Sequence, residues 1–281
     1  MKEIRKILVP IDFSACAMNA LKIAASIAKI QRASLEIVHA VQLPKELQVD
    51  VMAGMVINTP VLSEMEIEVE QEFQILENEI PDLCDLTYKT TKSTASTIDL
   101  INSCLEENPY DLIIMGTKGR HNIVDRLLGS ISADVIKASN VPVLVIPENF
   151  KSFHVFRMGL AADLKRLDDV RKLDILTLFS EMTKSEIKAF HISQKKDLKN
   201  KGEIIQERMK IMDAISKAKH SYVWIDEGEL TDGILEFVES HKLDMLVMFP
   251  RHHSFWDKIW HPSVTQKVVM DIQVPLLAIP G

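Results

Sequence analysis

The segment best suited to chemistry is a glycine-containing loop, residues 115–140, which reads MGTKGRHNIVDRLLGSISADVIKASN. It leaves an apolar run, passes Gly116 and Gly119, and reaches Gly129 and Ser130, where a helical pattern begins. Glycines permit a tight turn and let a ligand touch the backbone. A helix start offers free N–H groups and the positive end of the helix dipole. The loop therefore has the features of a phosphate site.

Positive charge in the loop supports a phosphate ligand, because the chain as a whole carries a formal net charge of -7. The basic side chains are Lys118, Arg120, His121 and Arg126, and the one acid among them is Asp125. Spacing alone leaves an alternative open: a glycine-rich turn with a capped helix and a solvated basic face. Neither G-x-G-x-x-G nor G-x-x-x-x-G-K-[ST] occurs, so the Rossmann and P-loop fingerprints are absent. The acidic balance argues against nucleic acid or anionic membranes as partners.

The elements that must position this loop alternate between apolar runs and helical patterns. The runs at 7–11, 35–41, 112–116 and 141–146 are continuous, which is typical of parallel strands buried on both faces. The helices are predicted from Ser14 with Ala17, Leu21, Ala24 and Ala28 inward, from 62 to 76 before Pro81, from 98 to 105 before Pro109, and from Ser130 with Ile131, Val135 and Ala138 inward. This alternation predicts an α/β, doubly wound fold that binds ligands at the carboxyl ends of its strands.

The chain also contains a degenerate internal repeat. Three pairs of segments correspond: 110–120 with 243–253, 140–147 with 273–280, and 7–14 with 158–165. We therefore predict two tandem domains, residues 1–148 and 152–281, joined by a linker at 149–151 within a polar segment. The second copy is shorter, and the loss is expected in the loop at 43–61.

The pattern G-x2-G-x9-G-S, from Gly116 to Ser130, resembles the ATP-binding signature of universal stress proteins. The segments ILVPIDFS, LEIVHAV and NVPVLVIP also resemble landmarks of that family, and the whole chain is similar to its tandem form. The resemblance implies two doubly wound domains of the adenine nucleotide alpha hydrolase-like type, each with a five-stranded parallel sheet. It also implies that the domains pair through their last strands, 141–146 and 274–279, across an internal pseudo-two-fold axis.

The same resemblance implies roles for individual residues. Asp12 would contact the nucleoside of ATP, and the backbone around Ala40 would hold the adenine. The other expected binding residues are Pro10, Met115, Gly116, Gly119, Gly129, Ser130 and Ile131, and Arg120 is added because of its charge. Mg2+ would accompany the nucleotide. For Asp12 the alternative is a carboxylate that caps the following helix near Ser14.

The second copy is expected to have lost this site. Phe249, His252 and Pro262 stand where the first copy has its three glycines, and only Ser130 is retained, as Ser263. Large side chains would occupy the phosphate space, and Pro262 lacks an N–H donor. The aromatic and histidine-rich segment 251–263 is expected either to fill the abandoned pocket or pack the domains together, or to form a metal or small-ligand site.

These observations favour a stress-response regulatory protein that binds an adenine nucleotide in its first domain and acts on an unidentified protein partner. Two alternatives remain: a slow ATP hydrolase or self-phosphorylating protein that uses Ser130, and an interaction module without nucleotide. Whether the protein is an enzyme stays open, although no Ser-His-Asp or paired-carboxylate arrangement is legible and non-catalytic function is favoured. Whether two chains form a homodimer is not readable.

The remaining features are consistent with a cytoplasmic protein, because no apolar window approaches the length of a membrane span or a signal segment. The three cysteines, Cys16, Cys84 and Cys104, show no metal spacing and are expected to be buried thiols. His39 and His191, near strand ends, are expected to be hydrogen-bonded core residues rather than catalytic ones.

Overall fold

The computed structural model describes residues 3–42, 60–117, 130–162, 169–193, 201–225, 230–249 and 273–280. The first half contains β1 (Lys6–Ile11), α1 (Ala15–Gln31), β2 (Ser34–Ala40), α3 (Pro60–Gln74), α4 (Leu76–Glu79), the 3-10 helix η1 (Pro81–Asp85), β3 (Tyr88–Ser93), α5 (Thr97–Glu107), β4 (Leu112–Gly116), α6 (Ser130–Ala138) and β5 (Val143–Ile146). The second half contains β6 (Arg157–Ala161), the 3-10 helix η2 (Val170–Leu173), α7 (Asp174–Thr183), β7 (Glu186–Ile192), α8 (Lys201–Ala214), β8 (His220–Ile225), α9 (Leu230–Ser240), β9 (Met245–Met248) and β10 (Leu276–Ala278).

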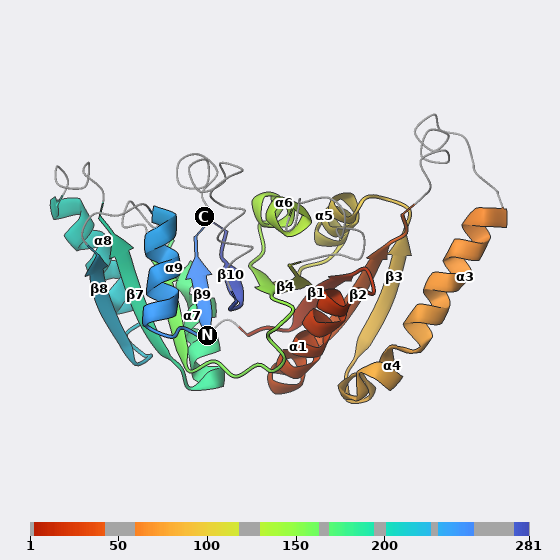
Figure 1. The fold of residues 1–281 in the computed structure, drawn as a ribbon, viewed down its shortest axis with the longest axis horizontal. Coiled ribbons are helices and arrows are strands. Elements are labelled where there is room, and N and C mark those ends of the chain that lie inside the picture. Colours follow the sequence, from red (N-terminus) through yellow and green to blue (C-terminus); the bar gives the residue numbers. More distant parts are fainter. Residues whose placement is uncertain are drawn as a thin grey trace.

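Within the described residues, the strands form one ten-stranded sheet in the order β3-β2-β1-β4-β5-β10-β9-β6-β7-β8. The five strands of each half run parallel to one another. Figure 1 shows the two halves side by side, with β3 and β8 at opposite ends of the sheet. The predicted α/β, doubly wound tandem architecture is therefore confirmed.

The two halves join through β5 and β10, which pair antiparallel. Leu144 lies opposite Leu277, and these two residues are equivalents in the repeat because they differ by 133 positions. The flanking pairs, Leu276 with Val145 and Ala278 with Val143, exchange equivalent positions in the same way. Such reciprocal pairing defines an isologous contact around a two-fold axis. The pairing expected for segments 141–146 and 274–279 is thus present in the structure.

Helices cover both faces of the sheet, and each face has its own buried cluster. Side chains of α1, α3, α4, α7 and α8 meet alternate strand residues such as Ile7 and Val9 on one face. Side chains of α5, α6 and α9 meet Leu8 and Val38 on the other face. Both clusters contain residues from the two halves, so the hydrophobic core is continuous across the junction.

Local sequence signals explain most helix boundaries. The Ser14 hydroxyl accepts a hydrogen bond from Ala17 N at 3.2 Å, and α1 buries its four predicted alanine and leucine positions. The predicted helix at 62–76 is divided between α3 and α4, and Pro81 begins η1.

Two sequence expectations about side-chain burial were wrong. Ala138 is exposed at the end of α6, whereas Val135 is buried as predicted and Ile136, which was not predicted, is buried as well. The predicted face was one turn too long, because α6 has only nine residues and ends at Ala138. Cys84 is exposed in η1, whereas Cys16 and Cys104 are buried as expected.

The linker between the two halves is held by a buried asparagine of the first helix. Asn19 Nδ2 donates to the carbonyl oxygens of Pro147 at 3.2 Å and Phe150 at 2.8 Å. The Phe150 ring lies 6.3 Å from that of Phe153, which in turn lies 5.9 Å from the ring of Phe179 in α7. The chain between the halves is therefore packed against both of them. The exact domain boundaries remain a prediction.

A buried carboxylate, Glu36, lies at the amino ends of the first-half strands and is 2% exposed. Tyr110 donates its hydroxyl hydrogen to Glu36 Oε2, and Thr91 Oγ1 donates to Oε1 at 3.2 Å. Lys89 Nζ lies 2.9 Å and Lys6 Nζ 3.4 Å from the carboxylate oxygens. Burial opposes ionisation, but these bonds and charges outweigh it and hold the pKa of Glu36 below its ordinary value of 4.5.

This network predicts an acid-sensitive contribution to stability. A carboxylate with a lowered pKa stabilises the fold above its unfolded-state pKa, and the contribution is lost as the pH falls through the folded-state value. We expect Glu36→Gln to lower the free energy of unfolding by about 1–3 kcal/mol at pH 7, with a smaller difference from wild type at pH 3.5. Urea unfolding at both pH values measures this. Glu106→Gln, at an exposed site on α5, is the control, and parallel pH profiles for wild type and Glu36→Gln would contradict the prediction.

Candidate functional site

The hydrogen-bonded ladder between β1 and β4 stops before the carboxyl ends of these strands, at the point where the chain order of the first-half sheet reverses. β1 pairs with β2 over its whole length, but with β4 only at Ile7–Leu112 and Leu8–Ile113. Ser34 N donates to Arg5 O, so the amide groups of even-numbered β1 residues face β4. The next ladder bond would need an N–H on Pro10, which proline lacks. Ligands of doubly wound folds bind at such a switch point.

Gly116, the last residue of β4, lies directly beneath the first turn of α1. A Cβ at this position would lie 2.9 Å from Cys16 Sγ and 3.0 Å from the Cys16 carbonyl carbon and oxygen. The neighbouring Thr117 Oγ1 is 3.6 Å from the same sulfur. Gly116 was expected from the sequence to contact the ligand, and the structure adds a packing reason, because only glycine lets α1 approach β4 so closely.

Asp12 lies immediately beyond β1, beside the start of α1. Its Oδ1 accepts a hydrogen bond from Ser14 N at 3.1 Å, and Ser14 in turn caps the helix. The alternative role considered for Asp12, support of the helix start, is therefore observed, and it leaves the expected nucleoside contact untested. Phe13, between Asp12 and Ser14, adopts a left-handed backbone conformation with φ 55°, which is uncommon for a bulky residue. Such strain persists only where the surroundings fix it, often beside functional sites.

Aromatic packing around Phe13 supplies that support. Its ring lies 4.9 Å from the ring of His39 on β2 and 5.5 Å from that of Phe73 on α3. His39 Nδ1 lies 2.9 Å from Ile11 O, and His191 Nδ1 lies 3.0 Å from the equivalent carbonyl, that of Ala162. Both histidines are thus hydrogen-bonded to the end of the neighbouring strand, as expected from the sequence.

The structure brings one group of predicted site residues to a single edge of the sheet. Pro10 and Met115 are buried near the ends of β1 and β4, and Ala40 is half-buried at the end of β2. Ser130 opens α6, and Ile131 follows it, half-buried. α6 has no acidic residue in its first turn, so its start suits an anion, whereas the start of α1 already carries the Asp12 carboxylate. Gly119, Arg120 and Gly129 lie outside the described residues.

The ladder at the equivalent place in the second half is longer. β6 and β9 remain paired as far as Ala161–Met248, and Ala161 is the equivalent of Pro10 with its N–H group retained. Phe249, the equivalent of Gly116, is buried in the core cluster just beyond this pair. His252, Pro262, Ser263 and segment 251–263 lie outside the described residues. Sequence reasoning identified Phe249 but missed the Pro10–Ala161 difference, which the repeat alignment already contained.

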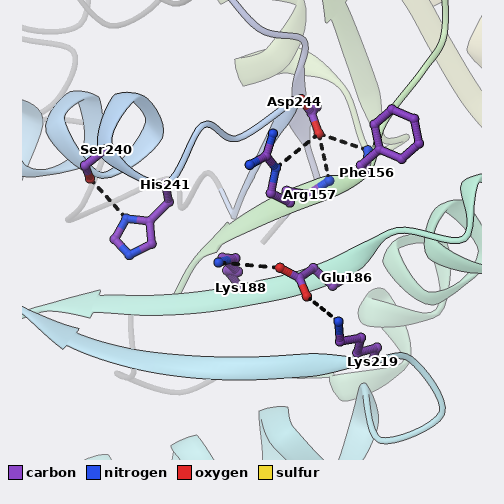
Figure 2. A network of polar contacts seen from close by, with 8 residues as sticks. All are labelled: Phe156, Arg157, Glu186, Lys188, Lys219, Ser240, His241 and Asp244. Atoms are coloured by element: carbon purple, nitrogen blue, oxygen red, sulfur yellow. Dashed lines mark hydrogen bonds and ion pairs between the residues drawn. The ribbon is translucent and has the colours of Figure 1, made fainter.

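Ion pairs and hydrogen bonds lie at the amino ends of the second-half strands, opposite the carboxyl ends just described, as Figure 2 shows. Asp244 Oδ2 accepts hydrogen bonds from the backbone N–H groups of Phe156 and Arg157, each at 2.9 Å. In the first half, Asp111 Oδ2 accepts the equivalent bonds from Arg5 and Lys6. Glu186 lies 2.9 Å from Lys219 Nζ and 3.4 Å from Lys188 Nζ, and chiefly the Lys219 bond lowers its pKa. These contacts tie strand starts to neighbouring segments.

Metal-binding clusters and membrane spans are both absent from the part of the chain that the structure describes. These residues contain no group of three or more His, Cys, Asp or Glu side chains that could hold a metal ion. Among their helices, none combines the length and apolar character needed to cross a bilayer.

Comparison with known proteins shows which protein family this chain resembles. The profile of the universal stress protein family matches it twice, at residues 3–147 and 158–280. It is 30% identical to universal stress protein MJ0577 of Methanocaldococcus jannaschii over 152 residues, and 30% identical to universal stress protein YxiE of Bacillus subtilis over 145 residues. Each alignment covers 50% of this chain and, respectively, 94% and 97% of the relative.

The fold of the whole chain also has a solved counterpart. A universal stress protein from Archaeoglobus fulgidus superposes with a TM-score of 0.68 at 18% sequence identity, covering 99% of this chain and 97% of that one. At that identity the likeness concerns the fold. Together with the double match to the family profile, it agrees with the repeat seen in the sequence and in the sheet, and the chain belongs to the universal stress protein family.

Proposed function

We propose that the first half binds an adenine nucleotide, ATP in the first instance, across the carboxyl ends of β1 and β4, and that the second half does not. The observation that carries this proposal is the difference between the two switch points. One has Pro10, a shortened ladder and Gly116, and the other has a longer ladder closed by Phe249. The glycine and basic pattern of residues 116–130 supplies the phosphate-binding chemistry in sequence.

The proposed output is regulation by occupancy, with Mg2+ accompanying the nucleotide. A ligand held by one conformation shifts the population toward it, and α1 would transmit occupancy because it contacts both the site and the linker. The proposal also includes a protein partner that binds the nucleotide-bound conformation. The stress-response role follows from the family.

Stoichiometry tests the proposal directly. We expect isothermal titration with ATP and Mg2+ to give one site per chain, and mass spectrometry of protein purified without added nucleotide to show which adenine ligand it carries. At 100 times the dissociation constant, binding should add roughly 2.7 kcal/mol to the free energy of unfolding. Two sites per chain, or no change in thermal stability with ATP, would overturn the proposal.

Asp12→Asn separates the two roles of Asp12. The asparagine Oδ1 can still accept the hydrogen bond from Ser14 N, so the thermal stability of the nucleotide-free protein should stay near wild type. The loss of charge should weaken ATP affinity about tenfold, or about 1.4 kcal/mol, if the carboxylate contacts the nucleoside. Titration and thermal melting measure the two effects. Equal ATP affinity in both proteins would leave Asp12 with the capping role alone.

A further inference from the structure

The outer edge of the second-half sheet differs from that of the first half. β8 is the last strand in the sheet order, and among the described residues it pairs with β7 alone. Ile187 N donates to Lys219 O and Ser193 N donates to Ile225 O, so the amide groups of odd-numbered β8 residues face β7. The N–H and C=O groups of His220 and Tyr222 therefore point away from the sheet.

Edge strands usually carry charges that prevent pairing with other chains, and β3 has them. Lys89 and Lys92 lie on this outer strand, where they form ion pairs with Glu36 and Glu70. At the equivalent positions β8 has Ser221 and Trp224, as the strand registers with β2 and β7 show. Ser221 is exposed, and Trp224 is 41% exposed.

No residue of β8, HSYVWI, is acidic or carries a permanent positive charge. Such a strand, rich in aromatic and β-branched residues, favours addition of a further strand to the sheet.

The charges on either side of β8 favour one kind of added strand, a second copy of β8, and one direction for it, antiparallel. Lys217 and Lys219 precede the strand and are exposed, with the Lys219 side chain 82% exposed despite its ion pair with Glu186. The sequence continues beyond Ile225 with Asp226, Glu227 and Glu229. A segment with a basic start and an acidic end attracts an antiparallel copy of itself and repels a parallel one.

We propose that β8 is a homodimerisation edge, on which β8 of a second copy docks antiparallel. The two-fold axis passes beside Tyr222, whose outward N–H and C=O groups exchange two hydrogen bonds with those of Tyr222 in the second copy. Ser221 then lies opposite Val223 of the second copy. The two ten-stranded sheets join into one, and the nucleotide edges of both chains remain open.

Sedimentation velocity over a concentration series tests the proposal on the full chain. We expect a monomer–dimer equilibrium for the wild type that weakens as salt increases, because flanking ion pairs are screened. Ser221→Lys, which restores the lysine of the equivalent β3 position, should raise the dimer dissociation constant by at least about tenfold, since each copy brings a like charge to the axis. The double reversal Lys217→Glu with Lys219→Glu should weaken dimerisation in the same direction.

Thr90→Lys is the matched control, because Thr90 is an exposed residue in the middle of the other edge strand. It should leave the dimer unchanged, and the far-UV circular dichroism spectrum and the midpoint of urea unfolding should stay close to wild type in every variant, which shows that each has folded. A wild type that sediments as a monomer at all concentrations overturns the proposal, as does a dimer that Ser221→Lys leaves intact. Equal effects of Ser221→Lys and Thr90→Lys also overturn it. The outcome is independent of the nucleotide stoichiometry.

Discussion

Gly116→Val should reduce both stability and ATP affinity, because the position where the nucleotide is proposed to bind is also where α1 packs on β4. A Cβ there would lie 2.9–3.0 Å from Cys16 Sγ, C and O, and two of these three are backbone atoms that cannot rotate away. Overpacking of this kind costs about 1–3 kcal/mol of unfolding free energy. Displacement of the first turn of α1 should also move Asp12 and Ser14. We expect ATP affinity to fall at least about 100-fold.

Urea unfolding and titration calorimetry measure these two effects, and Gly116→Ala should show a smaller loss of both. Gly202→Ala in α8 is the matched control, because a Cβ added to Gly202 would meet no atom within 4 Å and alanine favours a helix. It should leave the protein as stable as wild type or more so, by up to about 1 kcal/mol. A stable Gly116→Val protein that binds ATP normally would show that α1 and β4 tolerate separation.

Phe249→Ala should cause the largest loss of stability among these variants, without creating a second nucleotide site. Phe249 occupies the position equivalent to Gly116 and is buried in the core cluster that spans both halves. Truncation of a buried phenylalanine costs about 3–5 kcal/mol. A cavity alone should not bind ATP, because the ladder between β6 and β9 continues through Ala161–Met248 and its backbone groups stay paired within the sheet.

Urea unfolding and ATP stoichiometry are the measurements for this variant. Ile67→Ala, at a side chain 58% exposed on α3, should change the unfolding free energy by no more than about 0.5 kcal/mol. A second equivalent of ATP bound by Phe249→Ala would mean that the aromatic ring alone blocks the second half. If Phe249→Ala lowered the unfolding free energy by less than Ile67→Ala does, Phe249 would not be part of the hydrophobic core.

Most of the architecture could be predicted from the sequence, because parallel strands that are buried on both faces appear as continuous apolar runs. β1, β2, β4 and β5 lie within one or two residues of the runs at 7–11, 35–41, 112–116 and 141–146. β3 was not located, because YKTTKS is a polar edge strand and has no such run. The break at Ile75 that divides α3 from α4 was not predicted either, because the helical pattern of apolar residues continues through it.

The candidate site was only partly predictable. The glycine loop and the residue types at its edge follow from sequence, and the substitution of Phe249 for Gly116 follows from the repeat. The close approach of Cys16 to Gly116 could not be derived, because it depends on how α1 docks onto β4. The early end of the β1–β4 ladder had a sequence signal in Pro10, but this signal could be interpreted only once the structure showed which side of the strand lacks the N–H.

The reciprocal pairing of Leu144 with Leu277 has a consequence for how the halves can differ. In an assembly of identical chains, any substitution appears in every subunit, so an active and an inactive copy cannot be combined by design. Here both partners are encoded separately within one polypeptide, and their association does not depend on protein concentration. One half can therefore serve as a permanent structural companion of the other, and under the proposed function each chain would carry a single ligand site.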